Sequence, residues 1–189
     1  MTRLELKNLA KEQIKGKIGT IFVMFLIIFA LGFVCGFIPL IGGIAAFIIT
    51  PAFSLSICMV YLKLTKNEEI VVGDVFTGFN ATGKAVWLNI LIAVFTFLWS
   101  LLLLVPGIIK SYAYSMSYYV LADNPELTAR QALAKSKEIT QGHKMELFVL
   151  NLSFFWWSLL TILTFGIAGI YVIPYMDATM TNFYNSIKE

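Results

Sequence analysis

Hydrophobic residues run along this chain in long blocks that short polar stretches separate. A helix needs about 20 consecutive apolar residues to cross the roughly 30 Å hydrocarbon core of a bilayer. Six blocks approach that length, and the fourth is the shortest of them. The predicted spans are residues 18–37, 41–62, 85–105, 108–122, 145–164 and 168–185. We therefore predict an all-α integral membrane protein, a single polytopic domain over residues 1–189 with six transmembrane helices.

Short turns join these blocks in pairs. Residues 38–43, 105–107 and 165–169 contain Gly or Gly with Pro, the residues that most often end helices and turn the chain. Longer polar segments separate one pair from the next. The pattern predicts three helical hairpins in series.

The polar segments carry helical patterns of their own. Between the fourth and fifth blocks we predict a cytoplasmic amphipathic helix over residues 125–141, with Asn124 as its cap and Gly142 as its end. Its weak apolar stripe predicts docking on the helix bundle. A short interfacial helix is also expected within residues 63–84. Residues 1–17 form either a helix at the membrane surface or a solvated, partly frayed helix start.

Composition supports a lipid environment. Hydrophobic residues make up 59% of the chain and charged residues 13%, against about 25% charged residues in ordinary soluble domains. So few charges cannot cover a water-facing surface, so the lipid bilayer is the predicted partner. The net charge of +3 is small and spread along the chain, which predicts no nucleic-acid partner.

The distribution of the 14 Lys and Arg residues predicts the orientation. Five precede the first block, three lie in residues 63–84, four in residues 130–144, and one is Lys188; Lys110 alone breaks the pattern. The three short turns carry none. Because cytoplasmic loops are enriched in Lys and Arg, both termini are predicted to be cytoplasmic.

Three polar side chains fall within the predicted spans on the cytoplasmic side. By helical rise, Asp177 lies about 12 Å deep, Asn151 about 10 Å and Asn89 about 7 Å. They could form one polar layer contributed by three hairpins. A carboxylate within the membrane is a candidate functional residue. The alternative is a hydrogen-bonded cluster that only fixes helix register.

Lys110 lies close to the predicted outer turn, within a half-polar fourth span that should face protein or a cavity. Its ammonium group either extends to the outer headgroups or contacts an anion in an outward-facing pocket. Cys35 and Cys58 are predicted to be buried and reduced. Gly32 and Gly36 form a small-residue face that would permit close packing with a membrane-protein partner or a second copy.

The chain lacks the motifs of familiar enzymes. It has a single histidine, His143, and neither a phosphate-binding glycine loop nor a Cys-x-x-Cys pair. We predict no catalytic residues, no metal and no cofactor.

Several segments resemble a known family. They are Leu104–Tyr112, Tyr119–Pro125, Ala132–Ser136, Gly142–Phe148 and Ile173–Tyr175, with Ala178–Thr179, Asn182–Tyr184 and the opening stretch Glu5–Lys17. Together they resemble a bacterial membrane-protein family catalogued as domain of unknown function 975. The resemblance spans nearly the whole chain and implies a multi-pass protein of the bacterial cytoplasmic membrane. It implies no activity.

Two function hypotheses therefore stand beside each other. The first is a non-enzymatic membrane component that binds partners or lipids. The alternative is a small transporter or channel subunit with a polar layer around Asp177. A membrane-embedded enzyme is the third and weakest hypothesis, because no second acid, base or nucleophile other than tyrosine is expected beside Asp177.

Overall fold

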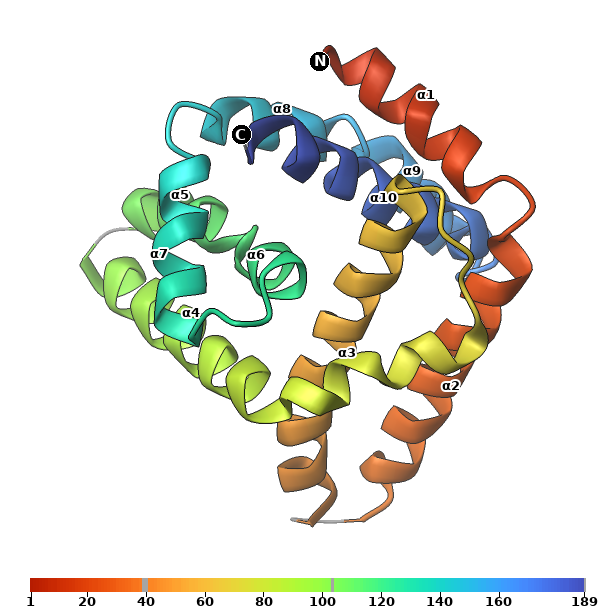
Figure 1. Ribbon diagram of the computed structural model, residues 1–189, viewed down its shortest axis with the longest axis horizontal. Helices are drawn as coiled ribbons and strands as arrows, with labels where there is room; N and C mark the ends of the chain where they lie inside the picture. Colours follow the sequence, from red (N-terminus) through yellow and green to blue (C-terminus); the bar gives the residue numbers. More distant parts are fainter. Residues whose placement is uncertain (39–40, 103, 189) are drawn as a thin grey trace.

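The structure is a computed structural model that describes residues 1–38, 41–102 and 104–188. Over these residues the chain is helical and contains no strand (Figure 1). The helices are α1 (Arg3–Ile14), α2 (Ile18–Gly36), α3 (Ile41–Thr65), the 3₁₀ helix η1 (Val72–Ala81), α4 (Thr82–Leu102), α5 (Leu104–Tyr114), α6 (Ser117–Asp123), α7 (Ala129–Ile139), α8 (Lys144–Leu152), α9 (Phe155–Leu163) and α10 (Gly169–Ile187).

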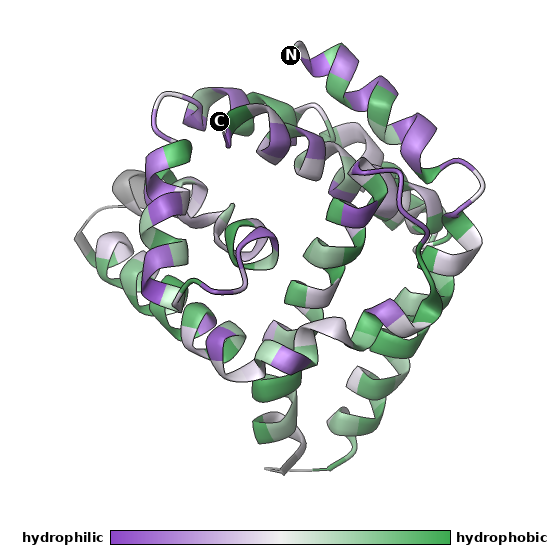
Figure 2. Ribbon diagram, in the orientation of Figure 1, coloured by the Kyte–Doolittle hydropathy of each residue, from purple (hydrophilic) through white to green (hydrophobic). Residues whose placement is uncertain are grey.

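Helix α2 is the most apolar element and one of the least buried. Only Ile21 and Met24 are buried within it. Large side chains such as Phe29 and Phe33 are 70% and 59% exposed. In Figure 2 hydrophobic residues cover α2 and the neighbouring first half of α3, whereas hydrophilic residues gather on α1, α7 and the segment between α3 and η1. The hairpin of α2 and α3 therefore presents apolar side chains to its surroundings.

Helix α3 changes character at Pro51. Before it, Ile44 and Phe47 are at least half exposed, and after it, Ala52 and Leu55 are fully buried. Proline has no backbone N–H, so it removes one hydrogen bond from the helix interior. The second half of α3 forms the centre of the hydrophobic core, where α4, α6 and α10 also pack.

The 3₁₀ helix η1 packs closely along α3. The Gly78 N–H donates to the buried Ser56 hydroxyl oxygen over 2.8 Å. A Cβ atom at Gly78 would lie 2.3 Å from the Ala52 carbonyl oxygen, so only glycine fits here. At the other end of η1, Asp74 forms an ion pair with Lys63 at 2.7 Å. The short helix expected within residues 63–84 is thus present, held against α3 at both ends.

The predicted number of spans is wrong. Within the described part of the chain, four helical segments are long and apolar enough to cross a membrane: Ile18–Gly36, Gly42–Thr65, Val72–Leu101 and Lys144–Leu163. The predicted fourth span is broken into α5 and α6 by a turn at Ser115–Met116. The predicted sixth span forms α10, which is 19 residues long but polar in its second half. The length of a hydrophobic block reveals neither a turn within it nor the polar residues that follow it.

The amphipathic helix between the fourth and fifth blocks begins four residues later than predicted. Thr128, rather than Asn124, caps α7, in a reciprocal pair of hydrogen bonds with Gln131. The Asn124 side chain instead donates to the Val120 carbonyl oxygen over 3.0 Å, so it closes the end of α6. Docking of this helix on the bundle is confirmed, because the buried Ser136 hydroxyl donates to the Ala113 carbonyl oxygen of α5 over 2.9 Å.

Helix α1 docks along α10 and is helical from Arg3 to Ile14. A capping pair between Thr2 and Glu5 starts it, and its buried face packs against α10 through Leu6, Ala10 and Ile14. Lys7 reaches across to the α8–α9 junction, where its ammonium group lies 4.1 Å from the centre of the Phe154 ring. Burial at this contact lowers the pKa of Lys7 from its ordinary value, and the charges of Arg3 and Lys11 lower it further.

Candidate functional site

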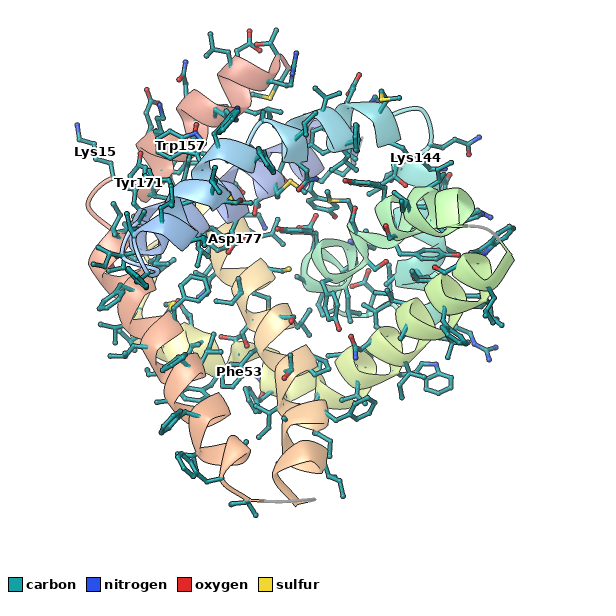
Figure 3. The ribbon with its side chains drawn as sticks, turned by 180° about the vertical axis from the view of Figure 1, so that it is seen from behind. Lys15, Phe53, Lys144, Trp157, Tyr171 and Asp177 are labelled. Atoms are coloured by element: carbon teal, nitrogen blue, oxygen red, sulfur yellow. The ribbon has the colours of Figure 1, made fainter. Side chains whose placement is uncertain are left out.

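The candidate site is the place where α3, α6 and α10 meet around Asp177. The Asp177 side chain is half-buried and lies near the middle of the view in Figure 3. It is close enough to interact electrostatically with Cys58 and Tyr61 of α3 and with Tyr119 of α6. Three segments far apart in the sequence therefore converge on one carboxyl group.

The spacing of polar residues along α10 explains this placement. Asp177, Thr181 and Tyr184 follow one another at intervals of four and three, so they share a face of the helix. The Thr181 hydroxyl donates to the Asp177 carbonyl oxygen over 2.8 Å, and the Thr179 hydroxyl makes the same kind of bond to Tyr175 over 2.7 Å. Both threonine hydroxyls thus donate to backbone carbonyl oxygens of their own helix and form no hydrogen bond with the Asp177 carboxyl group.

Two hydroxyl groups near this junction are buried without a hydrogen-bond partner among the residues that the structure describes. They are the Tyr61 hydroxyl of α3 and the Ser117 hydroxyl of α6. A buried, unsatisfied polar group costs about 1–3 kcal/mol, so such groups are rare in folded proteins. In the same described residues the Asp177 carboxyl group forms no ion pair. The junction thus retains unused hydrogen-bonding capacity beside an acid.

A second acidic residue organises the end of the junction. The Asp123 carboxylate accepts hydrogen bonds from Lys188 at 2.9 Å and from the Tyr184 hydroxyl at 3.2 Å. Lys66, just after α3, lies 3.9 Å from the same carboxylate. The Tyr184 ring also stacks on Tyr119, with centroids 5.6 Å apart. A line of polar groups therefore leads from the Asp123 ion pairs toward the surroundings of Asp177.

Asp123 was not singled out from the sequence as a site residue. Its position before Asn124-Pro125 indicated only a helix boundary. No local sequence pattern predicts that it contacts Lys66 or Lys188, which lie 57 and 65 positions away along the chain. Only the packing of α6 against α3 and α10 creates this cluster.

The polar layer predicted from Asn89, Asn151 and Asp177 is not joined by hydrogen bonds within the described residues. Asn89 accepts a hydrogen bond from the Tyr118 hydroxyl of α6 over 3.3 Å. Asn151 donates to the Leu147 carbonyl oxygen of its own helix over 2.9 Å. Helical rise gives the depth of a residue only along a straight span, whereas α8 ends at Leu152 and a turn precedes α9.

Lys110 lies on α5 with its ammonium group 4.4 Å from the centre of the Trp99 ring on α4. It is also within electrostatic range of Lys137 and Lys144. The charge pattern had placed those two lysines on the cytoplasmic side and Lys110 on the outer side, and the structure does not keep them apart in that way. No carboxylate forms an ion pair with Lys110 in the described regions.

The remaining sequence candidates lie apart from this junction or form no cluster. Cys35 and Cys58 are both free thiols; Cys58 is buried as predicted, whereas the predicted burial of Cys35 is wrong, because it lies in the exposed part of α2 and is only partly buried. Gly32 and Gly36 have no heavy atom within 4 Å of where a Cβ would lie, so their face is unused by the chain's own packing. Across residues 1–38, 41–102 and 104–188, no three His, Cys, Asp or Glu residues come together in a way that could hold a metal ion.

The observations define an all-helical protein with four segments apolar enough to span a membrane. A family model described as protein of unknown function (DUF975) matches residues 1–110 and 101–189, and the chain belongs to that family. The family suspected from the sequence motifs is thereby confirmed. No curated protein and no solved structure matches the chain.

Proposed function

We propose that this protein is a non-enzymatic component of the bacterial cytoplasmic membrane whose role is to bind lipids. The observation that carries the proposal is the exposure of α2. In the most apolar part of this helix only 11% of the residues are buried. Burying a single Leu or Phe side chain is worth about 1.5–3 kcal/mol in water, so leaving a whole helix of them exposed requires an apolar solvent.

Contacts between distant segments support an arrangement with both termini on one side. Lys188, next to the last residue, pairs with Asp123, which also lies near Lys66. Lys17, just before α2, donates to the Glu68 carbonyl oxygen over 3.2 Å. The positive-inside pattern assigns these lysines to the cytoplasm. We therefore propose that both termini, the segment after α3 and the segment after α6 lie on the cytoplasmic side.

Membrane extraction tests the proposal directly. We expect the full-length protein, produced in a bacterium, to stay in the membrane pellet after alkaline carbonate washing and to enter solution only with detergent. Single cysteines at Asn67 and Gln141 should react with a membrane-impermeant thiol reagent only after the cells are opened. Release by carbonate would contradict membrane integration, whereas labelling of Gln141→Cys in intact cells would contradict only the cytoplasmic placement of the segment after α6.

A transporter or channel subunit is the second candidate. The half-buried Asp177 on α10, which forms no ion pair within the described residues, and the unsatisfied Tyr61 hydroxyl on the adjoining α3 favour it, because intramembrane acids often line ion or substrate pathways. The test uses Asp177→Cys in a chain with Cys35→Ser and Cys58→Ala. Transport predicts labelling by a small charged thiol reagent in intact membranes. Absence of labelling, with Asn67→Cys labelled as a control in opened vesicles, would indicate a sealed structural cluster.

A further inference from the structure

We propose that a polar cavity beside α1 binds the headgroup of an anionic phospholipid. The cavity has a volume of about 520 Å³ and lies between α1, the α1–α2 connection, the end of α3 and the end of α10. Its polar lining includes Gln13, Lys15, Lys17, Asn67, Asn182 and Asn185. This proposal rests on the proposed membrane location and names a ligand class and a place for it.

The charges around the cavity favour a phosphate group. Lys15 and Lys17 contribute two ammonium groups against the single carboxylate of Glu12 among the lining residues. Neither lysine forms an ion pair within the described residues. The Lys17 ammonium group donates to one backbone carbonyl oxygen, that of Glu68, and keeps two further N–H donors. The lining is therefore net positive, with hydrogen-bond donors that are free to bind a phosphodiester.

The amide groups of the cavity are arranged to bind more than a phosphate. Gln13 and Asn182 hold each other through two hydrogen bonds of 3.0 and 2.9 Å, one in each direction. This pair fixes α1 to α10 and uses both of its amide oxygens. The Asn185 Oδ1 atom, by contrast, is buried and has no hydrogen-bond partner in the part of the chain that the structure describes.

An unpaired, buried acceptor calls for a donor from the ligand. Because an unsatisfied acceptor is costly, a hydroxyl or ammonium group that reached Asn185 would bind with a gain that the unprotonated oxygens of a phosphodiester cannot provide. The two lysines and Asn185 together fit a phosphodiester that carries hydroxyl donors. A glycerol headgroup is such a group.

The position of the cavity favours a lipid over a free phosphate. Lys17 immediately precedes α2, the helix whose apolar side chains are most exposed. An apolar groove of about 300 Å³ also lies between α2 and the start of α10, lined by residues that include Phe22, Phe29 and Ile173. Phe22 is five residues beyond Lys17, or about 7 Å along the helix. A lipid with its headgroup at the lysines therefore has apolar surface within reach of its chains.

The experiment measures phosphatidylglycerol bound to the purified full-length protein in neutral detergent micelles, by native mass spectrometry over a lipid titration. The test variant is Lys15→Gln with Lys17→Gln, and the matched control is Lys135→Gln with Lys137→Gln on α7, outside the cavity. We expect about a five-fold weaker affinity for each cavity lysine removed and less than a two-fold change in the control. Equal effects of the two variants would overturn the proposal.

Two further measurements distinguish recognition of the glycerol headgroup and of the lipid from binding of any phosphate anion. Asn185→Ala should weaken binding of phosphatidylglycerol and leave unchanged the binding of phosphatidylmethanol, an anionic phosphodiester whose headgroup has no hydroxyl donor. Soluble glycerol phosphate should compete only weakly, and competition as strong as that of the lipid would overturn the lipid assignment in favour of a free anion. Carbonate extraction of the cell membranes from which each variant is purified keeps the outcomes distinct, because a protein that is integrated in the membrane but shows no selective binding refutes the cavity site alone.

Discussion

Helices α2 and α10 are both 19 residues long, yet their burial is the reverse of what their composition would give in water. Helix α2 is almost entirely apolar and buries two residues, whereas α10 carries Asp177, Thr181 and Asn182 and buries ten. In a soluble protein the more apolar helix would occupy the core. The polar helix is central here, which is the arrangement expected when the surroundings are lipid.

The comparison also separates two kinds of stabilisation. Helix α2 makes few contacts within the chain, so its placement depends on the solvent around it. Helix α10 is held by specific partners, including the Gln13 amide at one turn and the Asp123 carboxylate near its end. Substitutions in the two helices should therefore fail in different ways, the first by loss of membrane insertion and the second by loss of folded stability.

Phe29→Arg in α2 should have the largest effect. Phe29 is 70% exposed, and an arginine at the centre of a membrane span costs about 2.5–3.5 kcal/mol. We expect a marked fall in the carbonate-resistant fraction. Leu4 on α1 is also 70% exposed, and Leu4→Arg should leave that fraction unchanged. If both variants kept the carbonate-resistant fraction of the unmodified protein, α2 would not face lipid, and its exposure could not be explained by a membrane environment.

Asn182→Leu in α10 should lower the stability of the detergent-solubilised protein by about 1–3 kcal/mol, because it leaves the Gln13 amide unpaired. Thermal unfolding in detergent measures the effect. Gln13→Met added to Asn182→Leu should recover most of the loss, since an apolar pair replaces both partners. Additive losses in the double variant would show that the amide pair does not couple α1 to α10.

Lys188→Ala should lower stability by about 1 kcal/mol or less. The Lys188–Asp123 pair is partly exposed, and Asp123 keeps contacts with Lys66 and Tyr184. The loss should shrink as salt is added, because salt screens exposed charges. Lys137→Ala, an exposed lysine outside any ion pair in the described segments, serves as the control. A salt-independent loss larger than about 2 kcal/mol would show that Lys188 acts by packing.

Gly32→Ala in α2 should have the smallest effect on the monomer, because a Cβ at Gly32 meets no atom within 4 Å. Replacing a helix-interior glycine by alanine is worth about 0.5–1 kcal/mol in favour of the helix. Thermal unfolding at low protein concentration should show this gain. A loss of stability that grows with protein concentration would instead reveal a second copy packed on the Gly32–Gly36 face.

The sequence by itself determined the helical class, the exposed apolar character of α2 and the family. Long apolar blocks and a low content of charged residues are visible in the sequence itself, so the predictions that rest on them need no knowledge of tertiary contacts. The docking of the helix after Thr128 also followed from a local pattern, although Asn124 proved to close α6 and did not start the next helix.

The tertiary structure decided what local patterns do not contain. The break between α5 and α6 removed one of the predicted spans, because helical continuity depends on how each segment packs as well as on its hydropathy, and the polar second half of α10 left four segments among the described residues apolar enough to cross a membrane. The meeting of Asp123 with Lys66 and Lys188, and the polar cavity between α1 and α10, join residues that are far apart in the chain. Such sites arise from packing of distant segments, and residue spacing along one segment carries no information about that packing.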